Sequence, residues 1–175
     1  HIFISTPVER VIDLSYGFLM LTPKGHKGSR SYKSGTYEAA LFEFLQKHVR
    51  EGEKIVDIGA ALGYYTLMFS KKLGISGKIY SFEPESNAYS YLKKNIIMNN
   101  IKNVETFNLA VDDKSGEASF SKTSDINNSN STWGGSISLV GSDLKVKTCS
   151  LDDLNLPCID WINLDVDGNE FRIIN

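Results

Sequence analysis

Hydrophobic positions along the chain form two kinds of pattern, short apolar runs and segments with helical spacing. The apolar runs predict four core strands, at Lys54–Ile58, Lys78–Phe82, Val104–Val111 and Asp160–Val166. Apolar residues at intervals of three and four predict amphipathic helices, at Thr36–Arg50, Gly63–Leu73 and Asn87–Asn99. Strands that alternate with helices of this length are typical of βαβ units. We therefore expect an α/β protein with a parallel sheet.

The two flanks of this region are less regular. Residues 1–34 mix short apolar runs with Pro and Gly, which predicts an extension of one or two strands and a loop before a main domain of residues 35–175. Ser86 is the candidate N-cap of the third helix. In the second half we expect a helical turn at Leu151–Leu154 and a final helix that starts at Phe171. We also expect three short strands, at Gly116–Ser121, Gly135–Val140 and Val146–Ser150. A Ser- and Asn-rich loop at Ser121–Gly134 contains Trp133, an anchor or a substrate contact.

Composition narrows the function classes. The chain has 175 residues, which suits one domain, and 19 Lys and Arg against 21 Asp and Glu. This balance gives no global field that favours nucleic acid or a membrane surface, and no apolar run is long enough to span a bilayer. We interpret the densest positive run as a solvated loop: Lys24, His26, Lys27, Arg30 and Lys33.

Cysteine use points to a reducing compartment. Cys149 and Cys158 are too few for a disulfide scaffold or a zinc site. We expect both to be buried free thiols, and the protein to be cytoplasmic. No signal peptide is evident.

The stretch KIVDIGAALGYYTLMFS, residues 54–70, holds the strongest functional signal. A strand ends in Asp57-x-Gly59, and Gly59-x-x-x-Gly63 opens a helix, where glycine permits a sharp turn and close approach of a ligand. A dinucleotide fingerprint would be G-x-G-x-x-G, but Ala61 takes the place of its middle glycine. The Asp57 carboxylate would repel a diphosphate and suits a cofactor with an ammonium and a sulfonium. The loop indicates S-adenosylmethionine rather than NAD, and the alternative is an ordinary strand–turn–helix.

Further carboxylates follow the other predicted strands, and ligands of open α/β sheets bind at such carboxyl ends. Glu83, at the spacing expected after the glycine loop, can accept two hydrogen bonds from a ribose diol. Asp165 and Asp167 share one face of the fourth strand end, so they could supply a general base or jointly hold a divalent cation. Asp165 could instead bond to backbone amides of the next turn. Glu170 is a weaker candidate because it could cap the following helix.

Several segments, in this order, resemble the FkbM family of S-adenosylmethionine-dependent methyltransferases. They are GTYEAALFEFLQKHVREGEKIVDIGAALGYYT, IYSFEPESNAYSYLKKNIIMNN, VETFNLAVDDKSGEASF, VKTCSLDDL and WINLDVDGNE. Together they cover most of Gly35–Glu170. The glycine loop and the Phe-Glu-Pro strand end are shared by many methyltransferases, whereas Ser-Leu-Asp-Asp-Leu followed by Asp-x-Asp-Gly-x-Glu is more specific to this family.

The resemblance implies a class I methyltransferase fold, a Rossmann-like three-layer sandwich. Cofactor contacts implied by it are Asp57, Gly59, Ala61, Gly63 and Asp165 around the methionine end and methyl group, Glu83-Pro84 at the ribose, and Asn108 and Ala110 beside adenine. Tyr64 and Tyr65 could pack against the cofactor, with core packing as the alternative for Tyr65. Ala61 replaces the family's usual Asn, and Asp167 its usual Glu. A class I methyltransferase has seven strands and only four core strands precede Asn175, so we expect a domain that is incomplete at its C-terminus. The bare sheet edge would favour association, for example as a homo-oligomer.

We therefore expect an O-methyltransferase that acts on a hydroxyl of a small molecule or glycan, with S-adenosylhomocysteine as product. Asp165 is the candidate general base or acceptor-orienting residue, assisted by Asp167 or Glu170, and no metal ligand is assigned. An RNA methyltransferase is the first alternative, disfavoured by the acidic balance and by the lack of an Asn-Pro-Pro type motif. A non-catalytic cofactor-binding scaffold is the second. An NAD-binding domain is disfavoured by the G-x-x-x-G spacing.

Overall fold

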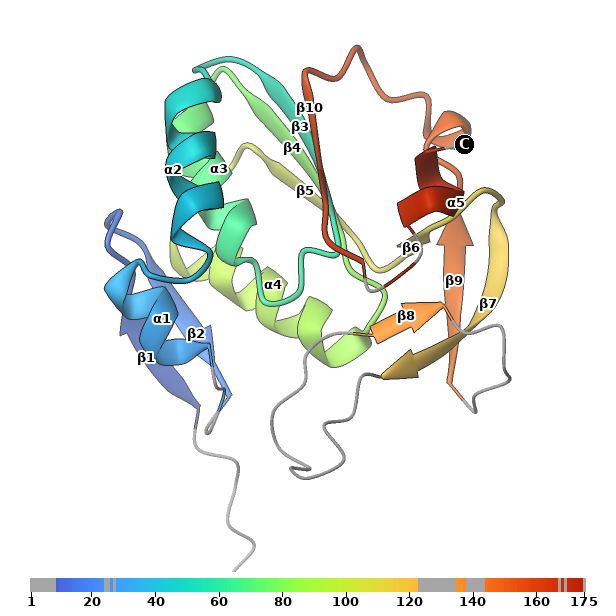
Figure 1. Cartoon of the computed structure of the whole chain (residues 1–175), viewed down its shortest axis with the longest axis horizontal. Coiled ribbons are helices and arrows are strands. Elements are labelled where there is room, and N and C mark those ends of the chain that lie inside the picture. Colours follow the sequence, from blue (N-terminus) through green and yellow to red (C-terminus); the bar gives the residue numbers. More distant parts are fainter. Residues whose placement is uncertain are drawn as a thin grey trace, which may run out of the picture.

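A four-stranded parallel sheet lies at the centre of the computed structural model, which describes residues 9–23, 26, 28–122, 135–137, 144–166, 168 and 170–174 (Figure 1). Its strand order is β10-β3-β4-β5, formed by Trp161–Leu164, Lys54–Ile58, Lys78–Phe82 and Val104–Phe107. The chain runs outward from β3 to β5 and returns to β10 on the other side of β3. The predicted α/β fold with a parallel sheet is confirmed, and its topological switch point lies between β3 and β10.

Three helices cover one face of this sheet, α2 (Ala39–His48), α3 (Tyr64–Leu73) and α4 (Ser86–Met98) (Figure 1). Alternate residues of β3 separate the two sides: Ile55 packs with Leu67 and Met68 of α3, while Val56 and Ile58 pack in a second cluster on the opposite face. The predicted N-cap at Ser86 is wrong by one residue. Glu85 takes that position, because its side chain accepts a hydrogen bond from the backbone N–H of Ala88 at 2.8 Å.

A smaller sheet lies on the other face, in the order β6-β9-β7-β8. Its strands are Ala110–Val111, Lys145–Cys149, Gly116–Lys122 and Gly135–Ile137. The single strand predicted for Val104–Val111 is therefore wrong, because β5 and β6 belong to different sheets. β5 ends where its partner β4 ends, at the pair Phe107 and Phe82, and the chain leaves this sheet at Asn108. Residues 138–140 of the strand predicted at Gly135–Val140, and Trp133 with most of its loop, lie outside the described residues.

The N-terminal segment forms a hairpin of β1 (Arg10–Asp13) and β2 (Leu19–Thr22), followed by helix α1 (Ser29–Ser34). The predicted strands are confirmed, but the loop predicted around Arg30 and Lys33 is wrong because both residues belong to α1. α4 holds the hairpin through two amide side chains. Asn95 bonds the backbone N–H and C=O of Leu21, and Asn99 does the same for Leu19. The domain boundary at residues 34 and 35 stays a prediction.

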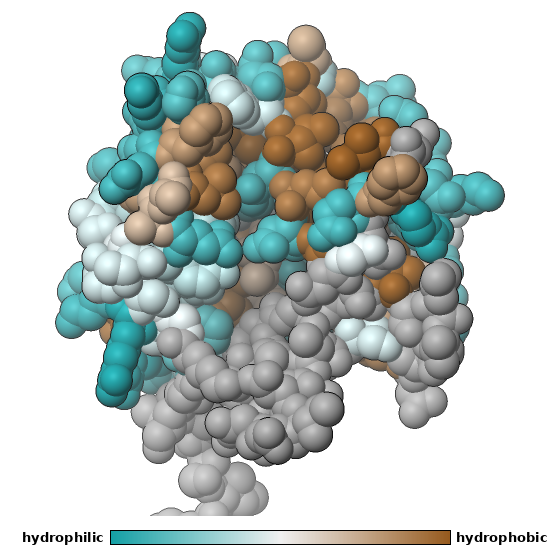
Figure 2. Space-filling view, viewed as in Figure 1, coloured by the Kyte–Doolittle hydropathy of each residue, from teal (hydrophilic) through white to brown (hydrophobic). Residues whose placement is uncertain are grey.

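The last described elements are the turn η1 (Asp152–Leu154), as predicted, and helix α5 (Glu170–Ile174). Cys149 is buried as predicted, whereas Cys158 is exposed, so that expectation is wrong. Apolar side chains reach the surface near the edge strand β10 and on α2 (Figure 2), where Ile162 is 57% and Phe44 49% exposed. Across the described part of the chain, the helices are too short or too polar to cross a membrane.

Candidate functional site

The loop between β3 and α3 has no room for larger residues at its two glycines. Gly59 has φ +84°, and a Cβ there would collide with the backbone oxygen of Asp165 at the end of β10. Gly63 has φ +97°, and its Cβ would lie 2.7 Å from Cδ1 of Leu92 in α4. Ala61 adopts the left-handed region with φ 47°, which is uncommon without glycine. The loop is thus pressed between β10 on one side and α4 on the other.

Glu83, at the carboxyl end of β4, is hydrogen-bonded to the backbone of this loop. Its carboxylate is only 5% exposed and accepts hydrogen bonds from the backbone N–H of Ala61 at 2.9 Å and of Glu85 at 2.7 Å. Burial raises the pKa of Glu83 to about 7 despite these bonds. Each oxygen accepts one backbone bond and retains a second lone pair for a ligand hydroxyl.

Asp57 lies beneath the loop rather than on its surface. Its side chain is 0% exposed, and its two oxygens accept hydrogen bonds from Thr66 Oγ1 of α3 and from Asn163 Nδ2 of β10, the latter at 2.8 Å. Burial raises its pKa. In this arrangement the Asp57 carboxylate ties α3 and β10 to β3. It offers no exposed oxygen to a ligand.

Asn108 and Ala110, the residues expected beside adenine, follow β5. Asn108 is exposed, and its Nδ2 donates to the carbonyl oxygens of Glu83 at 2.8 Å and of Pro84 at 3.0 Å. Ala110 is 5% exposed and packs in a small core cluster with Phe120 and Val146. Asn108 thereby fixes the strand end that carries Glu83, while Ala110 packs against other strands of the smaller sheet.

Tyr64 packs among aromatic rings of the N-terminal segment. It stacks on Tyr32 with ring centroids 4.5 Å apart and is 4% exposed. Its hydroxyl is buried and has no hydrogen-bond partner among the described residues. Tyr64 therefore links α3 to α1, and only its orphaned hydroxyl suggests a further polar contact.

The fourth-strand candidates are not all brought together. Asp165 is exposed at the end of β10, and its backbone N–H bonds to Ile58 of β3 at 3.0 Å. Asp167 lies outside the described residues. Glu170 begins α5, and its carboxylate accepts the N–H of Gly168, which precedes the helix, at 3.3 Å; the capping alternative for this residue stays a prediction.

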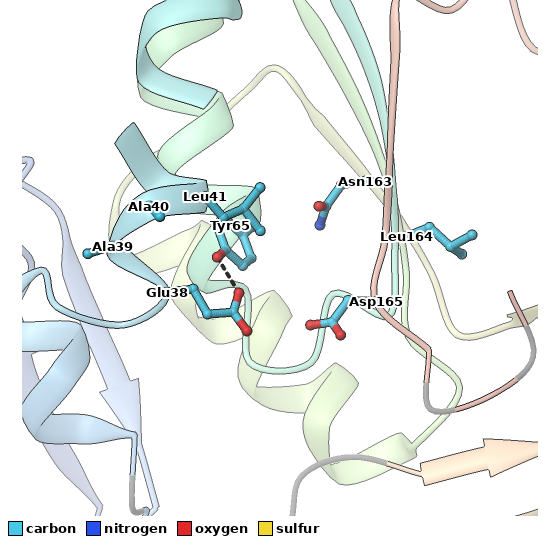
Figure 3. A pocket seen from close by; sticks show the side chains of 8 residues that line it. All are labelled: Glu38, Ala39, Ala40, Leu41, Tyr65, Asn163, Leu164 and Asp165. Carbon is cyan, nitrogen blue, oxygen red and sulfur yellow. Dashed lines mark hydrogen bonds between the residues drawn. The ribbon is translucent and has the colours of Figure 1, made fainter. Parts of the chain in front are cut away.

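A pocket of about 450 Å³ opens between the start of α2, the start of α3 and the end of β10 (Figure 3). Its walls are Glu38, Ala39, Ala40, Leu41, Tyr65, Asn163, Leu164 and Asp165. Glu38 and Asp165 approach the pocket from opposite sides, and the carboxylate of Glu38 accepts the hydroxyl of Tyr65 at 2.5 Å (Figure 3). Sequence reasoning missed Glu38 and Asn163. Hydrophobic spacing gives no signal for either, because both reach the site through tertiary contacts.

Comparison with known proteins identifies one family. The model described as the methyltransferase FkbM domain matches residues 57–175, and this match confirms the resemblance inferred from the sequence motifs. With the family, S-adenosylmethionine is confirmed as the cofactor.

Individual relatives match shorter parts of the chain. A protein-L-isoaspartate O-methyltransferase from Caenorhabditis elegans is 26% identical over 89 residues, which are 51% of this chain and 40% of that protein. A SAM dependent methyltransferase from Aquifex aeolicus is 28% identical, with a TM-score of 0.37, over 44% of this chain and 39% of the other. Trm5b from Pyrococcus abyssi is 20% identical, with a TM-score of 0.46, over 61% of this chain and 31% of the other. The chain spans less than half the length of these relatives.

Proposed function

The chain belongs to the FkbM methyltransferase family, and we propose that it binds S-adenosylmethionine across the ends of β10, β3 and β4 and methylates a hydroxyl of a small molecule or glycan. The observation that carries this proposal is the buried carboxylate of Glu83 directly against the glycine loop. A carboxylate at this position of an open α/β sheet suits a ribose diol.

The strand order gives the direction in which the cofactor would lie. Glu83 on β4 would hold the ribose, with the adenine toward Asn108 and β5. The rest of the molecule would then pass the glycine loop toward β10 and the pocket beside Asp165. Gly59 lets β10 approach the loop closely, which places Asp165 beside this path.

Asp57 has a positioning role in this proposal. Because both of its oxygens are already bonded and its side chain is fully buried, it supports the loop through Thr66 and Asn163 rather than contacting the ammonium directly. Tyr64 likewise supports the loop from the aromatic cluster.

Asp165 is the proposed residue for the acceptor. S-adenosylmethionine supplies a methyl group that is already electrophilic on its sulfonium. The exposed Asp165 carboxylate, at the rim of the pocket, would accept a hydrogen bond from the acceptor hydroxyl, orient its oxygen and receive its proton. Glu170 would assist indirectly by ordering the turn at Gly168, and Asp167 is a further candidate.

Methyl transfer can be tested with S-adenosylmethionine that carries a labelled methyl group, offered with a panel of hydroxylated small molecules, glycans and RNA. We expect label on an acceptor oxygen, and Asp165→Asn should lower kcat about 100-fold or more while the variant still binds S-adenosylhomocysteine. Label on RNA alone would support the RNA methyltransferase alternative. An unchanged kcat in Asp165→Asn would contradict the role of Asp165.

A further inference from the structure

We propose that Glu38, which precedes the matched family domain, binds the ammonium of the cofactor's amino-acid end, and that Tyr65 holds its carboxylate in position. This inference rests on the proposed cofactor site. In this proposal Glu38 takes the contact with the ammonium that the sequence alone suggests for Asp57, because the carboxylate of Asp57 is fully buried.

The first argument is the position of the pocket in the strand order. A ligand with its ribose at Glu83 on β4 must cross the glycine loop of β3 before it reaches β10. The space on that side of the loop is the pocket that Glu38 and Asp165 enter from opposite sides (Figure 3). The end of the cofactor remote from adenine would therefore lie beside Glu38.

The second argument is the backbone of Glu38. This residue adopts the left-handed region, with φ 44° and ψ 48°, which is uncommon for a residue other than glycine. It occupies the N-cap position of α2, yet its side chain makes no capping hydrogen bond with the helix. Instead the backbone conformation directs the carboxylate into the pocket. Strained residues of this kind cluster at ligand sites.

The third argument is the hydrogen bond to Tyr65. Tyr65 lies in the first turn of α3, directly after the glycine loop, and its ring is 7% exposed among Tyr37, Tyr64 and Phe69. Burial raises the pKa of Tyr65, so the hydroxyl remains a donor at neutral pH. Its bond fixes one oxygen of Glu38. Among the described residues the other oxygen has no hydrogen-bond partner, so it can accept a ligand N–H.

The fourth argument is the charge of the pocket. Two carboxylates, Glu38 and Asp165, line it, and among the described lining residues none is basic. Such a pocket favours a positive group and disfavours an anion. S-adenosylmethionine carries an ammonium and a sulfonium, whose positive charge suits these two carboxylates, and the carboxylate of its amino-acid end would point away from them.

Binding of two probes tests the inference without any acceptor. S-adenosylhomocysteine contains the amino-acid end, whereas 5′-methylthioadenosine has the adenine, ribose and sulfur but lacks it. By titration calorimetry we expect Glu38→Gln to weaken S-adenosylhomocysteine at least tenfold and to leave 5′-methylthioadenosine within twofold. Tyr65→Phe should weaken S-adenosylhomocysteine severalfold with the same selectivity.

Two further variants complete the design. Glu43→Gln changes an exposed residue of α2 that does not line the pocket, and it should bind both probes as the parent chain does. Glu38→Gly keeps the backbone conformation at its φ of 44° and removes the carboxylate, so it should show the same selective loss as Glu38→Gln. Equal weakening of both probes, or no weakening of S-adenosylhomocysteine, would overturn the role of Glu38. If the parent chain bound neither probe, the proposed function itself would fail.

Discussion

Two buried carboxylates, Asp57 and Glu83, lie beside the same loop and are used differently. Both oxygens of Asp57 bond to side chains of neighbouring elements, so Asp57 joins those elements. Both oxygens of Glu83 bond to backbone N–H groups of turns, which leaves each oxygen able to accept one more bond. Each oxygen of both residues accepts one bond, so burial and position separate the two roles: Asp57 lies fully buried beneath the loop, whereas Glu83 stays 5% exposed at the carboxyl end of β4.

Glu83 should make stability depend on pH. Its pKa is raised from 4.5 to about 7 by burial, so between these values the folded chain keeps a proton that the unfolded chain releases. Stability should therefore be greatest below the lower value and fall as pH rises through the upper one, by about 3 kcal/mol. Urea unfolding at pH 5 and pH 8 measures this fall, and Glu83→Gln should reduce it. Equal pH dependence in both chains would show that Glu83 is not the source.

At the scale of elements, the β3–α3 loop depends on the close approach of β10. Gly59→Ala should lower the unfolding free energy by about 3 kcal/mol, because the new Cβ meets the backbone oxygen of Asp165 and the residue keeps a positive φ. Gly17→Ala is a matched control with φ +86° and nothing within 4 Å of its Cβ, so it should cost about 1 kcal/mol. Denaturant unfolding of both variants measures the difference. Similar losses would mean that the contact with β10 contributes little.

The sequence predicts these elements unequally, for physical reasons. β3 and β4 are predicted with their observed bounds because each is a buried apolar run between polar ends. The break between β5 and β6 is not visible in the apolar pattern, because it depends on where β4 ends and on the hydrogen bonds of Asn108. The same division holds at the site. The glycine loop and Glu83 have local motifs, whereas Glu38 reaches the pocket through its backbone conformation and Tyr65.

At the scale of the whole molecule, Asn95 connects the N-terminal hairpin to the site. It is fully buried in α4 and bonds both backbone groups of Leu21 in β2 and the carbonyl of Leu62 in the glycine loop. At the β10 edge of the sheet, the apolar side chain of Ile162 is exposed to solvent. Self-association of the chain through this edge stays a prediction.

Asn95→Ala should therefore destabilise the chain by about 3 kcal/mol, because the buried carbonyl of Leu62 and the partly buried backbone groups of Leu21 lose their partner. Asn87→Ala, on an exposed position of the same helix, should change stability by about 0.5 kcal/mol or less. Denaturant unfolding compares the two. If both variants unfolded alike, the hairpin would not be held through Asn95.

The central claim is that the loop and Glu83 form a site for S-adenosylmethionine, and calorimetric titration with S-adenosylhomocysteine tests it most directly. We expect binding at sub-millimolar concentration, no binding of NADH, and a loss of about 1–3 kcal/mol of binding free energy in Glu83→Ala. The control is Glu105→Ala, which changes an exposed residue of β5 and should bind S-adenosylhomocysteine with the affinity of the parent chain. Absence of S-adenosylhomocysteine binding, or equal affinity of the parent chain and Glu83→Ala, would contradict the claim.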